Sequence, residues 1–432
     1  MNLADALLEH LAPWRAAPGW VVGLSGGLDS TVLLHLLSDL ARHHTLPPLR
    51  AVHIHHGLQS VADAWPVHCE RLCHALGVEL RVLQVAVASG ASIEARAREA
   101  RHRALAGQLC PGEALLLGHH RDDQAETVLF RLLRGAGVKG LSGMAGHRPM
   151  SPGTLLRPLL AVPRQHLEAY AEAHGLEWVE DPTNAQADAD RNFLRHRILP
   201  ELSKRWATAP ARIAQAAEHM AEAQALLDEL AVQDLAAAKP AAFTWLGLPC
   251  LALDPLRRLS PARQRNALRH FLQTLTLMPD ARHWQGWEDL RDARLAGEPA
   301  WRLAGGELRR SGEYLWWLAS PWLQPVPDAP PGWPAPHQPL ALPGNGHVLL
   351  AHVPPGALQV RYRQGGETLV LPGRGRRDLK RWLQEQGVPA FARGRWPLLF
   401  ADGQLVAVAG LAMAAGQEPL LRWCPPTNAQ CL

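Results

Sequence analysis

The sequence predicts an α/β protein with a doubly wound, mostly parallel sheet in its N-terminal domain, a helical middle domain and a small α+β C-terminal domain. Three observations indicate this class. Over roughly the first 200 residues, short apolar runs alternate with segments of helical period, which is typical of a parallel sheet covered by helices. The alanine-rich segment 211–238 has Leu and Met at helical spacing. A proline-dense stretch at 320–344 then precedes a region that mixes short strands with one helix near 376–386.

The elements of the N-terminal domain follow in order along the chain. We expect strands at 20–24, 50–55, 79–87 and 114–118 with helices between them. A chain of 432 residues is long enough for two or three domains. The boundaries that we expect are 1–210 for the α/β domain, 211–319 for the helical domain, 320–356 for a Pro-rich linker and 357–432 for the C-terminal domain.

The composition excludes several classes of protein. With 47% hydrophobic and 19% charged residues the chain is ordinary globular material, and its six cysteines form no CxxC pair, which argues against a disulfide scaffold. Asp5 and Glu9 interrupt the first apolar residues, and the apolar run near 405–416 is too short to span a membrane. We therefore expect a soluble, cytoplasmic protein. Its net charge of +4 comes almost wholly from arginine and is compatible with nucleic acid without proving it.

A glycine-rich loop follows the first strand. The stretch SGGLDS, residues 25–30, opens a helix whose apolar residues recur from Val32 to Leu40. Gly26 and Gly27 let a ligand approach the backbone closely, and the free N–H groups of the helix start favour an anion such as phosphate. Asp29 would repel phosphate unless a cation intervenes, which suggests Mg²⁺. A plain strand-to-helix turn is the alternative, but the motifs that follow speak against it.

Two further motifs belong to the second strand and the helix after the third. The stretch VHIHHGL, 52–58, brings His53, His55 and His56 to the edge of the sheet where ligands bind in open α/β folds. A functional and a structural role are equally open for these histidines. In the helix 92–105, which Ser92 would cap, Arg98 and Arg101 share one face, and the pattern alone favours a solvated basic face.

The densest group of polar residues follows the fourth strand. The run GHHRDDQAET, 118–127, crowds two histidines and three acids into a loop and the first turns of a helix. His119 and Asp123 are four residues apart and can point toward one centre. Acids at a helix start are also ordinary partners of its dipole, which explains one or two of them but not the histidines. Further on, Arg191, Arg195 and Arg197 fall within seven residues and would suit an RNA phosphate strand.

With these motifs together, the chain resembles the bacterial tRNA(Ile)-lysidine synthases, of the N-type ATP pyrophosphatase (PP-loop) superfamily. The glycine loop alone marks the superfamily. The more specific matches are EARAREARH (94–102), GHHRDDQAET (118–127), RLLRGAGVKGLSGM (131–144), RPLL (157–160), the segment from EDPTN to RNFLRHRILP (180–200), and the C-terminal region 360–411. His102 is a departure, since the resemblance leads us to expect Tyr there.

The resemblance implies an ATP-dependent ligase. ATP adenylates the wobble cytidine of the CAU anticodon of tRNA(Ile), and the ε-amine of free L-lysine then displaces AMP to give lysidine. Asp29 and Asp123 would hold Mg²⁺, His119 would handle a proton or polarise the α-phosphate, and Arg98 would stabilise the adenylated state or hold the carboxylate of lysine. The residues that would bind ATP are Ser25, Gly26, Gly27, Leu28, Asp29, Ser30 and His53.

The C-terminal region adds a basic surface. Nine basic residues lie between Arg361 and Arg395 against three acids, and Arg377, Lys380 and Arg381 fall on one face of the expected helix. The glycines before that helix leave room for a phosphate at its start. A solvated basic face is the alternative. Our hypothesis is that this face, with Arg191 and Arg195 in the N-terminal domain, binds tRNA, and that the tail grips it away from the anticodon, along the acceptor stem.

Two other functions stay open at this point. A tRNA thiolase of the same superfamily would often carry CxxC pairs, which this sequence lacks. A non-catalytic RNA-binding protein with a relict nucleotide fold would have lost its acids, whereas Asp29, Asp122, Asp123 and Glu126 are all present. The sequence leaves the oligomeric state undecided, with a homodimer as one option.

Overall fold

The computed structural model describes residues 3–55, 57, 63–85, 93–181, 190–294, 298–330, 332–373, 375–414 and 416–427. His56, Ser92 and Arg374, which the sequence patterns above include, lie outside these residues. The chain forms two compact units, 1–225 and 226–432, and the boundary falls inside the long helix α10 (Ala209–Ala237).

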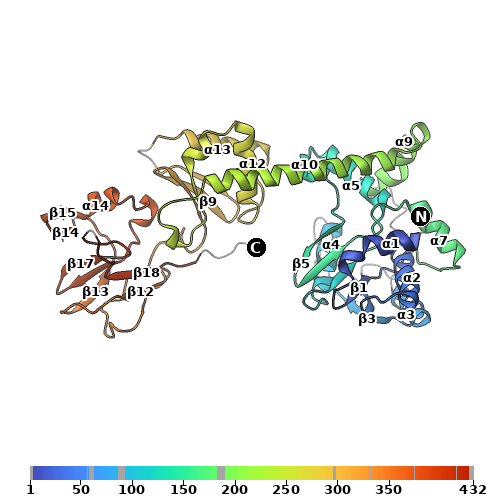
Figure 1. The fold of residues 1–432 in the computed structure, drawn as a ribbon, viewed down its shortest axis with the longest axis horizontal. Coiled ribbons are helices and arrows are strands. Elements are labelled where there is room, and N and C mark those ends of the chain that lie inside the picture. Colours follow the sequence, from blue (N-terminus) through green and yellow to red (C-terminus); the bar gives the residue numbers. More distant parts are fainter. Residues whose placement is uncertain are drawn as a thin grey trace. The chain divides into compact units, whose positions relative to one another are not determined.

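The first unit is the predicted doubly wound α/β domain (Figure 1). Its six-stranded sheet has the order β3-β2-β1-β4-β6-β5, in which every neighbouring pair is parallel except β5 and β6. All four predicted strands are present as β1 (Trp20–Gly23), β2 (Leu49–His55), β3 (Glu79–Gln84) and β4 (Ala114–Leu116). The antiparallel hairpin of β5 (His147–Met150) and β6 (Gly153–Leu156) extends this sheet beyond the prediction.

Helices cover both faces of the sheet because its strands are apolar on both sides. On one face, α1 (Leu3–His10), α2 (Leu28–His43), α3 (Trp65–Leu76) and α7 (Arg164–Ala173) share a core with the strands. On the other face, α4 (Ile93–Ala106) packs Leu105 against Val21, Ile54 and Leu155. Each fully buried leucine contributes about 1.5–3 kcal/mol. The strand order reverses between β2 and β4 on either side of β1, so the loops after β1 and β4 meet at the switch point of the sheet, where ligands bind in such folds.

The remaining helices of the first unit follow β4 and α7. They are α5 (Arg121–Leu133), α6 (Val138–Leu141), α8 (Asp190–Phe193), the wide turn η4 (Leu194–Ile198) and α9 (Leu199–Arg205). Helix α5 contacts both α8 and η4, which brings the arginines of 191–197 beside it. Among the described residues, no helix is both long and apolar enough to cross a membrane.

The segment 211–319 contains more than the helices that we expected. Helices α10, α11 (Leu253–Arg257), α12 (Pro261–Leu272) and α13 (Gln285–Asp292) are joined by an antiparallel sheet of β7 (Cys250–Ala252), β8 (Ala300–Leu303), β9 (Gly306–Ser311) and β10 (Tyr314–Leu318). The sheet forms because alternate residues such as Trp301, Leu308 and Leu315 bury against Trp287 of α13. Gly305, with φ of +77°, makes the turn between β8 and β9.

The segment 320–356 is not the free linker that its prolines suggest. It contributes β11 (Leu340–Ala341) and β12 (His347–Leu350), which form a sheet with β18 (Leu421–Cys424). Trp322, Trp333 and Val348 between the prolines are buried in the same core as Trp396 and Trp423. Because these large apolar side chains are buried, they order a segment whose prolines would otherwise favour an extended chain.

The C-terminal region has the expected α+β character. It comprises β13 (Leu358–Arg361), β14 (Thr368–Leu371), β15 (Gly375–Asp378), α14 (Leu379–Glu385), β16 (Leu398–Ala401) and β17 (Gln404–Val408). The predicted helix near 376–386 starts only at Leu379, because residues 375–378 pair with β14 as a strand.

Candidate active site

The glycine loop after β1 forms a compact cradle at the start of α2. The Ser30 hydroxyl receives the Ser25 N–H at 3.1 Å and donates to the Gly27 carbonyl at 3.1 Å, and the two serine hydroxyls are 2.9 Å apart. Gly26 has φ of +84°, a conformation that favours glycine. No side chain caps α2 at Gly27, so the first N–H groups of this 16-residue helix stay available to an anion.

Two other segments close around this loop. The Val179 N–H donates to the Gly26 carbonyl at 2.9 Å, which brings Val179 and Asp181 to the cavity. On the other side, Gly118 lies so close to α2 that a Cβ there would be 2.8 Å from the carbonyl carbon of Asp29. Only glycine fits at this contact, and it holds the β4 loop against the phosphate cradle.

His120 organises the acids of the site. It is almost fully buried and caps α5 by accepting the N–H groups of Asp122 and Asp123, while Asp123 accepts the His120 N–H at 3.1 Å. Burial lowers the pKa of His120, but the contact with Asp122 and the charges of Asp123 and Asp29 outweigh this effect and raise it. Nε2 is 3.7 Å from Asp29 Oδ1 and 3.5 Å from Asp123 Oδ2. A single histidine therefore faces both carboxylates that the sequence pointed to.

The two carboxylates differ in what they contact. Burial raises the pKa of Asp29, with Asp123 adding to the effect and His120 opposing it. Asp29 Oδ1 is buried and has no hydrogen-bond partner among the described residues. Asp123 uses Oδ2 for the His120 N–H and Oδ1 for Arg195 at 2.9 Å. Asp29 is therefore the carboxylate that is still able to bind a cation.

Arg195 is engaged with acidic side chains, whereas an RNA-binding arginine has to be accessible to phosphate. Its guanidinium contacts Glu126 at 2.6 and 2.9 Å and Asp123 at 2.9 Å, and it is mostly buried. A charge paired with two carboxylates in this way has little left for an RNA phosphate. The prediction for Arg195 is therefore wrong: Arg195 holds the acids, whereas Arg191, one turn earlier, is half-buried and pairs with no carboxylate of the described residues.

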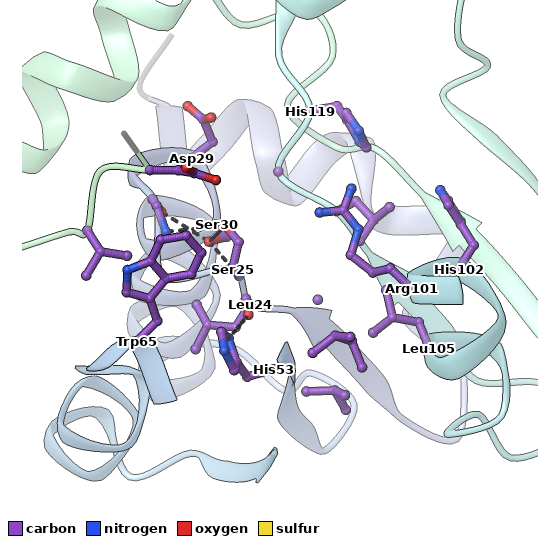
Figure 2. A pocket seen from close by; sticks show the side chains of 18 of the residues that line it. Leu24, Ser25, Asp29, Ser30, His53, Trp65, Arg101, His102, Leu105 and His119 are labelled. Carbon is purple, nitrogen blue, oxygen red and sulfur yellow. Dashed lines mark hydrogen bonds between the residues drawn. The ribbon is translucent and has the colours of Figure 1, made fainter. Parts of the chain in front are cut away.

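Arg101 and His102 line the cavity opposite Asp29 (Figure 2), and further arginines lie close enough to act on His102 and His119. Burial, and then the charges of Arg98, Arg101, Arg148 and Arg157, lower the pKa of His102 to about 4. His119 has its pKa lowered to about 3 by burial, and Arg157, Arg98 and Arg101 add to this against the opposing charge of Asp123. Both histidines are therefore neutral at pH 7. We call Arg98, Arg101, Arg148 and Arg157 the arginine cluster.

The cavity between the two groups measures about 310 Å³, at the lower end of the range for small-ligand sites. It is lined by the glycine loop, Asp29, Asp123, His119, Arg101 and His102. Trp65, at the start of α3, and His53 form the wall beside the loop (Figure 2). His53 Nδ1 donates to the Leu24 carbonyl at 2.9 Å, so its Nε2 is the acceptor nitrogen.

The residues present fit Mg²⁺ as nucleotide enzymes usually bind it, through few protein ligands and the phosphates of the nucleotide. Among the described residues, no three His, Cys, Asp or Glu side chains are grouped to hold a metal. Mg²⁺ does not need such a cage, because one or two carboxylates and the phosphates of a nucleotide suffice. The unpartnered Asp29 oxygen beside the glycine loop meets that requirement.

The C-terminal basic residues are arranged differently from the prediction. Arg377 belongs to β15, where it is opposite Leu369, and only Lys380 and Arg381 belong to α14. The carboxylate of Asp378 already caps this helix through the Arg381 N–H at 2.8 Å, so the expected phosphate position at its start is taken. All three basic side chains are nevertheless exposed.

Several residues of the site escaped the sequence analysis. Arg148 and Arg157 reach the cavity region through the β5–β6 hairpin, which has no strong strand pattern. Trp65 had no recognisable signal. Asp122 did have a signal, since it belongs to the run 118–127. Its role is structural, however, because its carboxylate accepts the Arg164 N–H at 2.9 Å and thereby caps α7. The motif RPLL (157–160), which begins with Arg157, was the available signal for the arginine cluster.

Three family models match successive parts of the chain. Residues 2–202 match the family of PP-loop domains, 251–316 the TilS substrate binding domain and 358–423 the TilS substrate C-terminal domain. The solved structure of a U34-tRNA thiolase from Methanococcus maripaludis aligns with a TM-score of 0.43 and 19% identity, over 51% of this chain and 78% of that one.

Full-length relatives give the family. The tRNA(Ile)-lysidine synthase of Pseudomonas syringae pv. tomato is 55% identical over 100% of this chain and 98% of its own length. That of Pseudomonas aeruginosa is 55% identical over 99% of this chain and 98% of its own length. A similarity of this degree, which includes both the PP-loop domain and the two TilS domains, means that the chain belongs to the tRNA(Ile)-lysidine synthase family.

Proposed function

We propose that this chain converts the wobble cytidine of a tRNA(Ile) with a CAU anticodon into lysidine, with ATP and free L-lysine as its other substrates. One observation carries the proposal. The glycine loop, an Asp29 oxygen with no hydrogen-bond partner among the described residues and Arg101 of the arginine cluster line one cavity, in a chain that matches lysidine synthases along its whole length. A tRNA substrate also implies a cytoplasmic reaction.

The first step joins the cytosine to AMP. The carbonyl oxygen at C2 attacks the α-phosphorus of ATP, the bond between the α- and β-phosphates breaks, and pyrophosphate leaves. This turns a poor leaving group into a phosphate ester. We assign the binding of the departing phosphates to the glycine loop, through the N–H groups at the start of α2 and the hydroxyls of Ser25 and Ser30. His53 and Trp65 line the same cavity and are assigned to the nucleoside of ATP.

Asp29 is the proposed principal ligand of Mg²⁺. When bound, Mg²⁺ neutralises the charge that develops on the α-phosphate and pyrophosphate. Asp123 remains a second candidate ligand, but only if Oδ1 exchanges Arg195 for the ion. Nε2 of His120 faces both carboxylates, at 3.7 Å from Asp29 Oδ1 and 3.5 Å from Asp123 Oδ2, without a hydrogen bond to either.

The second step replaces AMP by lysine. The ε-amine, once it has lost a proton, attacks C2 of the cytosine, and the bond from C2 to the ester oxygen breaks to release AMP. His119 is neutral at pH 7 and lines the cavity, so it is suited to donate a hydrogen bond to an α-phosphate oxygen. Arg98, with the rest of the arginine cluster, is assigned to the anionic groups of the reaction, which are the adenylate and the carboxylate of lysine.

Binding of tRNA is assigned to both units. We propose that residues 1–210 hold the chemistry, that 211–319 contact the tRNA, and that 357–432 bind it away from the anticodon through Arg377, Lys380 and Arg381. The exposure of these three residues supports this role. In the first unit the tRNA contact falls to Arg191, since Arg195 is engaged with acids.

The test is mass spectrometry of nucleosides after incubation of tRNA(Ile), ATP and lysine with the protein. We expect lysidine to form at the wobble cytidine only when all three substrates are present. Release of AMP should require tRNA, because the base and not lysine accepts the adenylate. Full-rate AMP release from ATP and lysine alone would mean that the amino acid is adenylated and that the proposed reaction is wrong.

The thiolase alternative has weaker support. Cys69 and Cys73 are buried, and burial raises their pKa values to about 12 and about 11. Thiols in this state are poor ligands for iron and poor nucleophiles. An iron assay on the purified protein separates the two functions.

A further inference from the structure

An aromatic and basic surface lies at the end of α5, outside the cavity. Arg134 and Arg191 both lie over the ring of Phe130, at 5.1 and 5.8 Å from its centroid. Two apolar side chains near them in sequence are strongly exposed, Leu133 at 75% and Phe193 at 46%. We call Phe130, Leu133, Arg134, Arg191 and Phe193 the α5–α8 platform.

The platform continues the active site. Asp123, Glu126, Phe130 and Arg134 follow one another on α5 at spacings of three, four and four residues, so they form one stripe along the helix. Arg195 contacts the first two members of the stripe, and Arg191, four residues earlier, contacts Phe130. The stripe leads from the cavity outward over about 16 Å, given the rise of an α-helix.

The charges of the platform are available to a partner. Among the described residues, neither Arg134 nor Arg191 forms an ion pair with a carboxylate. Arg131, the residue after Phe130, is used internally instead and donates to the carbonyls of Gly140 and Gly143 at 2.8 and 2.7 Å. Single Arg–aromatic contacts are common in proteins, but Phe130 is the one described ring that carries two.

This combination fits single-stranded RNA better than a protein partner. An apolar protein surface would leave two unpaired guanidinium groups buried, which is costly. Splayed nucleotides offer both phosphates for the charges and bases that stack on guanidinium planes and aromatic rings. The ring of Phe130 holds the two guanidinium groups in orientation, so less side-chain freedom is lost on binding.

We infer that the α5–α8 platform binds the nucleotides of the anticodon loop that flank the target cytidine, and so guides that cytidine into the cavity. The inference rests on the proposed function. Arg134 and Arg191 contact the phosphates and stack on the bases, while Leu133 and Phe193 cover the exposed base faces. Phe130 acts as a positioning residue.

The test compares Arg134→Ser/Arg191→Ser with the control Arg15→Ser/Arg42→Ser. The control removes the same charge from exposed positions in the same unit, and Arg42 is in the last turn of α2, far along that helix from the cavity. The substrate is the isolated anticodon stem-loop of tRNA(Ile), which avoids any contribution from tRNA contacts elsewhere. Binding is measured over a series of salt concentrations, and lysidine formation is measured on the same RNA.

For the platform variant we expect binding of the stem-loop to weaken about 10- to 100-fold. The slope of log K against log [salt] should fall by about 0.7 for each single-strand phosphate that the variant no longer neutralises. The KM for RNA should rise while kcat and ATP binding stay within about twofold, and the control should match the wild type. The lysine variant Arg134→Lys/Arg191→Lys should retain the salt slope but bind more weakly, because an ammonium group offers no plane on which a base can stack.

A photoreactive nucleotide next to the target cytidine provides an independent readout and should crosslink to peptides of α5 or α8. Unchanged affinity and slope in the platform variant, or equal losses in variant and control, would overturn the inference. The proposed function fails separately, if the wild type binds the RNA but makes no lysidine from it.

Discussion

Replacing Gly118 by alanine tests how the two loops of the site depend on each other. A Cβ at this position would lie 2.8 Å from both the carbonyl carbon and oxygen of Asp29 and 3.0 Å from the nitrogen of Ser30. Ordinary contact needs about 3.4 Å, so one of the two segments has to move by about 0.6 Å. No change of rotamer relieves the clash, because every one of these atoms belongs to the backbone. Overpacking of this kind costs about 1–3 kcal/mol of stability.

The displacement matters more for catalysis than for folding. It moves Asp29 and Ser30, which we assign to the metal and the phosphates, and misplacement by a large part of an ångström costs about 10- to 100-fold in rate. We expect tRNA-dependent AMP release by Gly118→Ala to fall by this factor, with weaker ATP binding in equilibrium dialysis. Gly146→Ala is the matched control, since a Cβ there meets nothing within 4 Å. Wild-type AMP release and ATP binding in Gly118→Ala would refute the argument that this contact sets the loop geometry.

Three further changes probe other parts of the molecule. Asp29→Asn should reduce AMP release at least about 100-fold while filter binding of tRNA stays within about twofold; undiminished release would exclude Asp29 as the metal ligand. Asp122→Asn should lower the stability of the α5–α7 region by about 1–2 kcal/mol at pH 7, seen as faster amide exchange in α7. Burial alone would raise the pKa of Asp122, but its contacts with His120 and the Arg164 N–H lower this pKa to about 2. The ionised carboxylate therefore stabilises the fold fully above pH ~4, and the difference in stability between variant and wild type should vanish toward pH 2. Charge reversal at Arg377, Lys380 and Arg381 should weaken tRNA binding and flatten its salt slope by about 2–3, with ATP binding unchanged; an unaltered slope would remove the tail from the tRNA interface.

Local patterns were sufficient for the sheet and the cradle. The strands β1 and β4, which carry the two loops of the site, are short apolar runs. The rule that ligands bind beyond the carboxyl ends of parallel strands brought residues 25–30 and 118–127 together without any contact information. The arginine at position 195 shows where this reasoning ends. Its spacing with Arg191 and Arg197 suits RNA, but its partners Glu126 and Asp123 are about 70 residues away in sequence.

Segments with mixed composition were the other source of error. Prolines at 320–344 favour an extended linker, yet Trp322 and Trp333 between them bury enough apolar surface to join the C-terminal core. Arg377 fits the helical spacing of Lys380 and Arg381, but its backbone pairs with β14 and Asp378 starts the helix one residue later. In both cases tertiary burial or pairing outweighs a weak local preference.

The separation of charge in the cavity has a consequence for proton chemistry. Acids gather beside the glycine loop, where Arg195 and His120 hold them, and the arginine cluster faces them from α4 and the β6 end. Burial is the main reason that His119 stays neutral, and the charges of Arg157, Arg98 and Arg101 add to it against the opposing charge of Asp123. A phosphate or carboxylate bound at the cluster offsets that repulsion, so the proton affinity of His119 rises only while an anionic substrate is present. In the proposed reaction, His119 would therefore be an N–H donor in the free protein and would gain proton affinity when the adenylate or the lysine carboxylate binds beside it.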